Sequence, residues 1–222
     1  MATTKQKPQS IDSELLAGWT SIIEAWSSVF ANTITVSGDF TSKYQKGDKV
    51  RLVHDAATKY FYITSCTHSA GTTTIVVTGG TDYIIDNSNA LSSIFYSHTD
   101  NPIGFPGAFN YTPTLTPNGA MTYTSTSVSY AKFSISGRTV TLTLRFTGTV
   151  GGTPTNYISA TLPITNGATQ SLYLARIVDG TEVTGYINIG AGTSSADFGK
   201  ANGGNFSAGA GRDCSCVKQY FI

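Results

Sequence analysis

The histidines, the side chains best suited to acid–base or metal chemistry, are isolated from one another in this sequence. None of His54, His68 and His98 stands in a Ser-His-Asp-like local context, and there is no His-x-His pair. A threefold axis could gather three copies of one histidine around a metal, but isolated histidines more often lie in solvated turns or strands. The sequence therefore predicts neither a catalytic base nor a metal site.

Paired carboxylates, which would be needed to cleave a glycosidic bond, are not clearly indicated either. Candidate acids are Asp39, Asp48, Asp82, Asp179, Asp197, Asp213, Glu14, Glu24 and Glu182. Several of the aspartates adjoin glycine, where Asp commonly forms a turn. The glycines between residues 203 and 211 are not followed by the Lys-Ser/Thr of a phosphate loop. We therefore predict a non-enzymatic chain without a cofactor.

The three cysteines, Cys66, Cys214 and Cys216, do not form an obvious disulfide framework. Their number is odd. In a strand, Cys-Ser-Cys places two side chains on one face, which is a poor geometry for a mutual bridge. The sequence therefore predicts buried free thiols.

Aromatic side chains are the remaining candidates for contact with a ligand or partner. Alternate members of Tyr60–Tyr62 face opposite sides of a strand, so core or a subunit interface is the expected place for this trio. Phe198 and Phe206 lie in a Gly-, Ala- and Ser-rich stretch, residues 190–211, that reads as a long loop. Together with Tyr186 they are the candidate contact residues.

Composition limits the class of protein. Charged residues make up 12% of the chain and the formal net charge is +1, so there is no basic surface to attract nucleic acid or an anionic membrane. The surplus of β-branched Thr favours strands. No signal peptide or apolar span of membrane length is recognisable, which predicts synthesis in a cytoplasm. A surface rich in Thr, Ser and Gly suits a chain packed into an assembly.

The hydrophobic pattern is that of an all-β protein. Val140, Leu142, Leu144 and Phe146 alternate with polar residues, and the preceding Phe133–Ile135 strand joins this one through a tight turn. A second hairpin is expected around Asp179-Gly180, and residues 214–222 are expected to form a strand inside the sheet. Residues 11–32 fit an amphipathic helix and extended chain equally well.

Two domains are expected. Residues 1–17 form an N-terminal attachment segment and residues 18–100 a small β-barrel-like module. Residues 101–108 form a linker, because the NPIGFPGAF run cannot continue a helix or a ladder, and its apolar residues suggest that it docks onto a surface. Residues 109–222 are predicted to form a jelly-roll-like antiparallel β-sandwich. The polar leader, residues 1–10, is expected to pack against a partner.

The order of short motifs resembles a module of tailed-bacteriophage tail-fibre and minor structural proteins. These motifs are TITVSGDF, YQKGDKVRL, KYFYIT, NPIGFPGAF, FNYTPT and GRTVT, and the resemblance extends over most of the chain. Residues 11–31 depart from it, since they are more helical in pattern than the start of that module.

The resemblance implies a homotrimeric fibre, spike or tail-tip protein of the virion that takes part in host attachment. Its N-terminal region would hold other virion proteins, and its sandwich would meet a host-surface glycan or protein. Three alternatives stay open: a head fibre or capsid-decorating protein, a carbohydrate-binding adhesin, and an enzyme that degrades host polysaccharide.

Overall fold

A computed structural model describes residues 13–167 and 171–222. Within these ranges the chain forms one short helix, α1 (Ser13–Leu16), and two antiparallel sheets of seven and nine strands. The prediction of an all-β fold is confirmed. The expectation that the polar leader packs against a partner falls on residues outside the described ranges.

The N-terminal sheet holds the first seven strands of the chain. Their spatial order is β1 (Thr20–Ser21), β7 (Ser92–Ser97), β4 (Lys49–His54), β5 (Ala57–Ser69), β6 (Thr72–Thr78), β3 (Thr33–Ser37) and β2 (Ser27–Phe30). The edge strands β1 and β2 are joined directly by residues 22–26, so the sheet must curl to bring its edges near each other. It encloses a core that includes Ile34, Tyr44, Leu52 and Phe61.

The C-terminal sheet holds the remaining strands. Their spatial order is β8 (Phe109–Asn110), β10 (Met121–Ser136), β11 (Thr139–Gly152), β16 (Gly209–Phe221), β13 (Ser171–Asp179), β14 (Thr181–Ile189), β15 (Ser195–Lys200), β12 (Tyr157–Thr161) and β9 (Leu115–Pro117). The sheet folds over on itself, so that β9 approaches β10. Phe146 of β11 meets Phe198 of β15 across the core, with ring centroids 5.2 Å apart. This is the face-to-face packing of a β-sandwich.

The two expected hairpins are both present. Strands β10 and β11 pair outward from Ser136 and Thr139, so Gly137 and Arg138 form the turn. The sequence pattern predicts this turn one residue earlier, at Ser136-Gly137. The β13–β14 hairpin turns at Gly180, whose φ of +83° suits glycine. Strand β16 lies between β11 and β13, inside the sheet as expected.

The ambiguous stretch that begins at residue 11 resolves mostly as extended chain. The helix stops at Leu16, and Gly18 follows with a left-handed φ of +83°. Trp19 is then fully buried and donates a hydrogen bond from Nε1 to the carbonyl of Ile103, 2.9 Å away. Tertiary packing of this tryptophan therefore overrides the helical periodicity.

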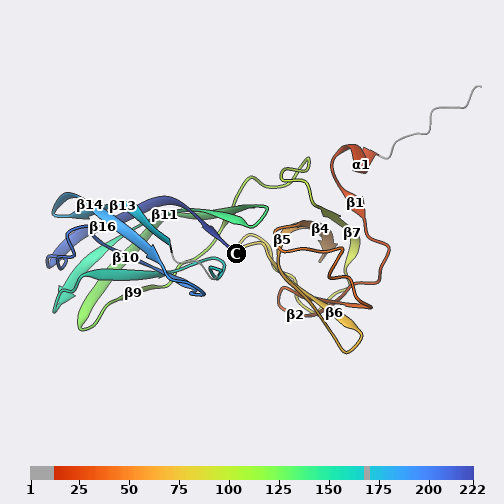
Figure 1. Cartoon of the computed structure of the whole chain (residues 1–222), viewed down its shortest axis with the longest axis horizontal. Helices are drawn as coiled ribbons and strands as arrows, with labels where there is room; N and C mark the ends of the chain where they lie inside the picture. Colours follow the sequence, from red (N-terminus) through yellow and green to blue (C-terminus); the bar gives the residue numbers. More distant parts are fainter. Residues whose placement is uncertain (1–12, 168–170) are drawn as a thin grey trace, which may run out of the picture.

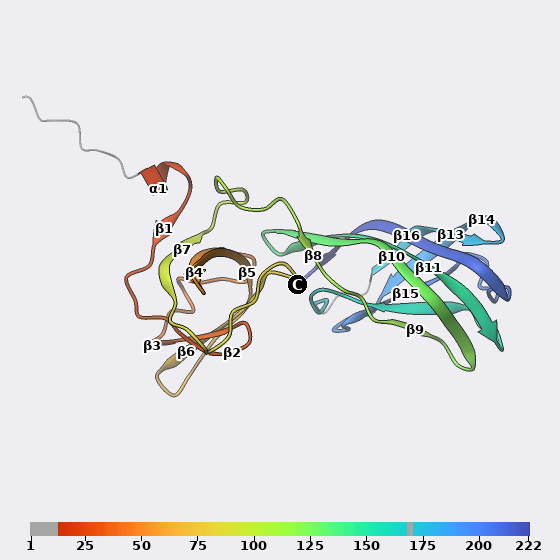
Figure 2. The same ribbon diagram turned by 180° about the vertical axis from the view of Figure 1, so that it is seen from behind.

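The two sheets form separate bodies that meet end to end (Figure 1). The C-terminus lies at their junction, while α1 lies at the far side of the N-terminal body, as the reverse view also shows (Figure 2). Residues 101–108 connect the bodies. Phe105 of this connection is buried, but Ile103 is 72% exposed, so the expected docking of the linker is wrong for that side chain.

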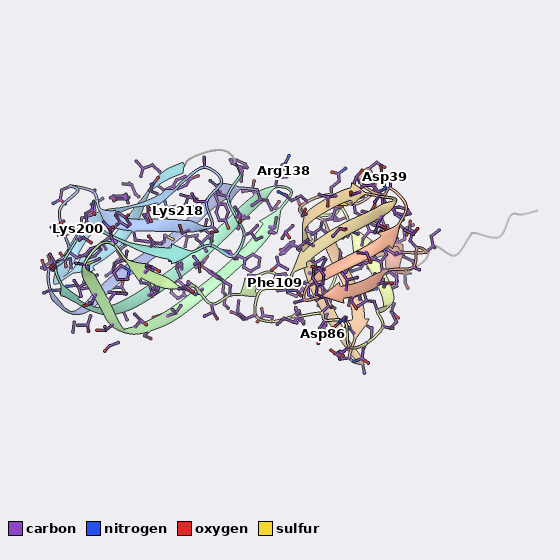
Figure 3. All side chains as sticks on the ribbon, turned by 90° about the horizontal axis from the view of Figure 1, so that it is seen from below. Asp39, Asp86, Phe109, Arg138, Lys200 and Lys218 are labelled. Atoms are coloured by element: carbon purple, nitrogen blue, oxygen red, sulfur yellow. The ribbon has the colours of Figure 1, made fainter. Side chains whose placement is uncertain are left out.

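The junction is held by aromatic rings. The ring centroid of Tyr62, on β5, lies 5.3 Å from that of Phe109 and 5.0 Å from that of Phe105. The Tyr62 ring also approaches the ring of Phe133 in the C-terminal sheet. Phe109 stands between the two bodies (Figure 3). Of the trio Tyr60–Tyr62, Phe61 is in the N-terminal core, Tyr62 is in this junction and Tyr60 is half-buried. The C-terminal core therefore continues across the junction onto the N-terminal sheet.

Candidate contact surface and interdomain cleft

The three residues predicted to form a contact loop do not lie together. Phe198 and Phe206 are 0% and 2% exposed, so the prediction that they form a contact surface is wrong. Phe198 is in strand β15, where its neighbours pair with β12 and β14 and its ring points inward. The Phe206 backbone NH is bonded to the Thr155 carbonyl. The glycine-rich composition had suggested a loop throughout, but strand pairing in β15 places the Phe198 ring in the core. Phe206 does lie in the loop between β15 and β16, and its ring is nevertheless buried in the same core.

Tyr186 alone stays accessible, on the outer face of β14. Its ring lies over Gly199 of the neighbouring strand, where an added Cβ would be 2.6 Å from the ring. It is directly opposite Leu174 in the β13–β14 ladder. A glycine thus makes room for an aromatic ring to lie flat across the sheet.

Around Tyr186 the outer face of the C-terminal sheet exposes apolar side chains. We call this set the outer strip: Tyr130, Leu172, Leu174, Tyr186 and Val217. Both leucines are 68% exposed and Val217 is 63% exposed. Leu174 borders two shallow hollows, one of about 550 Å³ shared with Tyr186 and Leu172 and one of about 310 Å³ shared with Tyr130 and Val217. Through these two hollows the strip extends from β14 across β13 and β16 to Tyr130 of β10, with β11 between β16 and β10.

A charged network borders the strip. Asp213 accepts hydrogen bonds from Arg145 Nε at 2.7 Å and from Arg176 Nη1 at 3.0 Å. Arg176 Nε also donates to Glu182 at 2.9 Å. Within this network two arginines and two acids balance, and Lys218 adds one further cation at the second hollow.

One sign of the strip was present in the sequence. Leu172, Tyr173, Leu174 and Ala175 run without the polar alternation of a half-buried strand. A strand that is apolar on both faces indicates burial on both faces. In the described chain the inner face is covered by the core and the outer face is not.

A polar cleft of about 600 Å³ lies between the two bodies. We call it the interdomain cleft. The N-terminal body contributes the 44–49 segment, part of β5 and His98, and the C-terminal body contributes the hairpin tip, Gly137 and Arg138. Figure 3 places Arg138 at the end of the C-terminal body that faces its neighbour.

The histidines lie in three different surroundings. His98 Nδ1 is 2.8 Å from Asp48 Oδ1 at the cleft. His68 Nδ1 is 3.8 Å from Asp39 Oδ2. His54 is 1% exposed, which contradicts the expectation of a solvated side chain. It lies at the end of β4, where Asp55 and Lys59 approach its Nδ1. Among residues 13–167 and 171–222, no group of three or more His, Cys, Asp or Glu side chains could hold a metal ion.

The three cysteines are free thiols, and Cys214 and Cys216 are buried as predicted, whereas Cys66 is only half-buried. Burial raises the pKa of Cys216 to about 12 and raises the pKa of Cys214 well above the ordinary range. Burial and the nearby Asp39 and Asp48 carboxylates raise the pKa of Cys66. All three environments disfavour a thiolate nucleophile.

Comparisons of the chain with protein-family models, with curated proteins and with solved structures find no match. No helix in the described part of the chain is long and apolar enough to cross a membrane. The geometry thus offers two features with which to reason about function: an apolar strip bordered by balanced charges, and a polar cleft between two bodies.

Proposed function

We propose that this chain is a non-enzymatic structural protein of a tailed-phage virion, a homotrimeric tail-fibre or tail-tip subunit that takes part in host attachment. The observation that carries the proposal is the outer strip. A contiguous exposed apolar surface of this kind marks an interaction site rather than a solvent-facing sheet. The motif order described above supports the phage assignment.

A second copy of the chain is the partner proposed for the strip. Its rim of Arg145, Arg176, Glu182 and Asp213 carries both signs equally, so two copies do not repel each other there. Covering the strip in a closed assembly also removes apolar surface from water around the symmetry axis.

The opposite end of the molecule is the part proposed to meet other virion proteins. Leu15 and Leu16 of α1 are 60% and 69% exposed, and Ile23 after β1 is 91% exposed. Helix α1, which carries both leucines, lies at the far side of the N-terminal body (Figure 1). A partner that covers them would leave the β-sandwich pointing away from the particle.

Immunogold electron microscopy of purified phage particles tests the assignment. We expect antibodies against residues 109–222 to label the tail or tail tip. Label on the capsid shell would replace the tail assignment with a head fibre or decorating protein. Particles that carry no label, from a lysate in which the chain is expressed, would contradict a virion protein.

A further inference from the structure

We infer that the interdomain cleft is a binding site for an anionic saccharide unit, one that carries a carboxylate or a phosphate beside its hydroxyl groups. This deepens the proposed role in host attachment and rests on it for the source of the ligand. Three properties of the cleft support such a site: its charge, its lining and the close contact between its walls.

The cleft has a surplus of positive charge. Among the described residues that line it, Lys46, Lys49 and Arg138 are cationic and Asp48 is the one carboxylate, while the carboxylate of Asp100 lies 3.5 Å from Lys49 and offsets that charge. Asp48 is already engaged, because Oδ2 accepts the Gln45 backbone NH at 2.7 Å and Oδ1 lies 2.8 Å from His98. The chain as a whole has a net charge of only +1, so this surplus is local.

Two of these cations are available to a ligand. Lys46 and Arg138 are both exposed. Arg138 Nε donates to the backbone oxygen of Ile222 at 3.0 Å, which orients the guanidinium and leaves its two terminal nitrogens for other acceptors. Lys49 is different, since its side chain is 1% exposed and its ammonium lies 3.5 Å from Asp100. An oriented arginine and an exposed lysine lining the same cleft are a suitable pair for a carboxylate or phosphate.

The rest of the lining suits hydroxyl groups. Thr41, Gln45 and Ser65 supply side-chain donors and acceptors, and the volume of about 600 Å³ is in the range of small-ligand sites. A bare inorganic anion would use the cations and leave these groups to water. An anionic sugar or polyol phosphate would use both.

The walls of the cleft are fixed relative to each other. Gly47 has a φ of +95°, and a Cβ there would overlap the carbonyl oxygen of Gly137 from the other body. Backbone therefore rests on backbone at the base of the cleft. A site built from two bodies is preorganised when their contact is this close, which lowers the cost of binding.

Amide NMR titration of the full chain tests the inference with three probes. Methyl glucuronide carries a carboxylate, glycerol phosphate carries a phosphate, and methyl glucoside is the neutral control. We expect at least one anionic probe to bind with a Kd of about 10 mM or tighter and to shift the amides of residues 45–49 and 137–138. The neutral probe should not bind in this range. The anionic probe that binds more tightly identifies the source as a uronic acid or a phosphate polymer.

Matched variants locate the site. The double variant K46Q/R138Q keeps the side-chain lengths and should weaken binding about tenfold or more. K132Q removes an equally exposed cation that does not line the cleft, and it should bind as the unaltered chain does. Absence of binding by both anionic probes would overturn the inference. So would equal binding of the neutral probe, or equal losses in K132Q and the double variant. Particle labelling does not depend on any of these results, so the two proposals fail separately.

Discussion

Asp179 shows how single polar residues organise the end of the sandwich farthest from the junction. Its side chain is 4% exposed, and it accepts hydrogen bonds from Lys200 Nζ at 2.9 Å and from the Ser207 backbone NH. Arg212 Nε lies 3.0 Å from its other oxygen. One carboxylate thus ties the β13–β14 turn to the end of β15 and to the segment before β16.

The Asp179→Asn variant should lose about 3 kcal/mol of unfolding free energy, because it leaves two cations around a neutral group. Burial by itself raises the pKa of Asp179, but the hydrogen bonds from Lys200 and Ser207 outweigh it and hold this pKa below its ordinary value. The lowered pKa contributes stability above the unfolded value near 3.8, and this contribution is lost as the pH falls through the folded pKa.

Urea unfolding at several pH values measures this effect. The difference in unfolding free energy between the unaltered chain and D179N should be largest at neutral pH and should shrink below about pH 4. Asp39→Asn is the control, because Asp39 also has a lowered pKa, from hydrogen bonds with Thr41, but its side chain is 58% exposed. D39N should unfold nearly as the unaltered chain does. An equal loss in both variants would contradict the role of Asp179.

The thiols provide a second residue-scale prediction. Cys214 and Cys216 should stay unlabelled by a thiol reagent near pH 8 while the chain is folded, because burial raises both pKa values and blocks access. Any native labelling should come from the half-buried Cys66 and should vanish in C66S. Added denaturant should then make Cys214 and Cys216 react with the thiol reagent. Rapid native labelling of C66S would mean that β16 is not packed inside the sheet.

At the scale of elements, the close contact between Gly47 and Gly137 keeps the two bodies in one orientation. The Gly47→Ala variant must either strain the turn or separate the bodies. Gly71→Ala is matched to it, because Gly71 also has a positive φ of +77° but has no atom within 4 Å of an added Cβ. G47A should lose about 2 kcal/mol more unfolding free energy than G71A.

Limited proteolysis distinguishes a strained turn from separated bodies. We expect G47A to be cleaved faster within residues 101–108, while G71A is cleaved as slowly as the unaltered chain. Equal cleavage of the two variants would show that the glycine contact does not control the junction.

The elements that the sequence predicted well are those whose pattern is local. The alternation from Val140 to Phe146 specifies both the strand and its buried face, and the structure agrees. Strand β15 was missed because its pairing with β12 and β14 is a long-range contact that a glycine-rich composition conceals. The outer strip was missed for a related reason: β10, β13, β14 and β16 each contribute one or two residues, and only their order in the sheet brings these together.

The interdomain cleft could not be predicted from the sequence. Lys46 and Arg138 are separated by most of the N-terminal body and the linker in sequence, and each looks like an ordinary turn cation. Their proximity depends on how the hairpin tip of one body meets a turn of the other. That contact leaves no periodic signal in the sequence.

At the scale of the whole molecule, two joined β bodies carry exposed apolar groups and a polar cleft at different places. Helix α1, with the exposed Leu15 and Leu16, lies at one end, and Arg138 of the cleft lies at the junction (Figures 1 and 3). The outer strip lies on the C-terminal sheet. This separation would let one subunit hold a particle, its own copies and a ligand at the same time.

We propose that the chain works as a structural subunit that self-associates through the outer strip, and native mass spectrometry measures this association. At about 10 μM we expect the unaltered chain to show a trimer mass and the L174K/V217K variant a monomer mass, because each introduced charge would lose its water at the interface. The I84K variant is the control, since Ile84 is 55% exposed on the N-terminal body, and it should remain trimeric. A monomeric unaltered chain, or a trimer that survives L174K/V217K, would contradict the account.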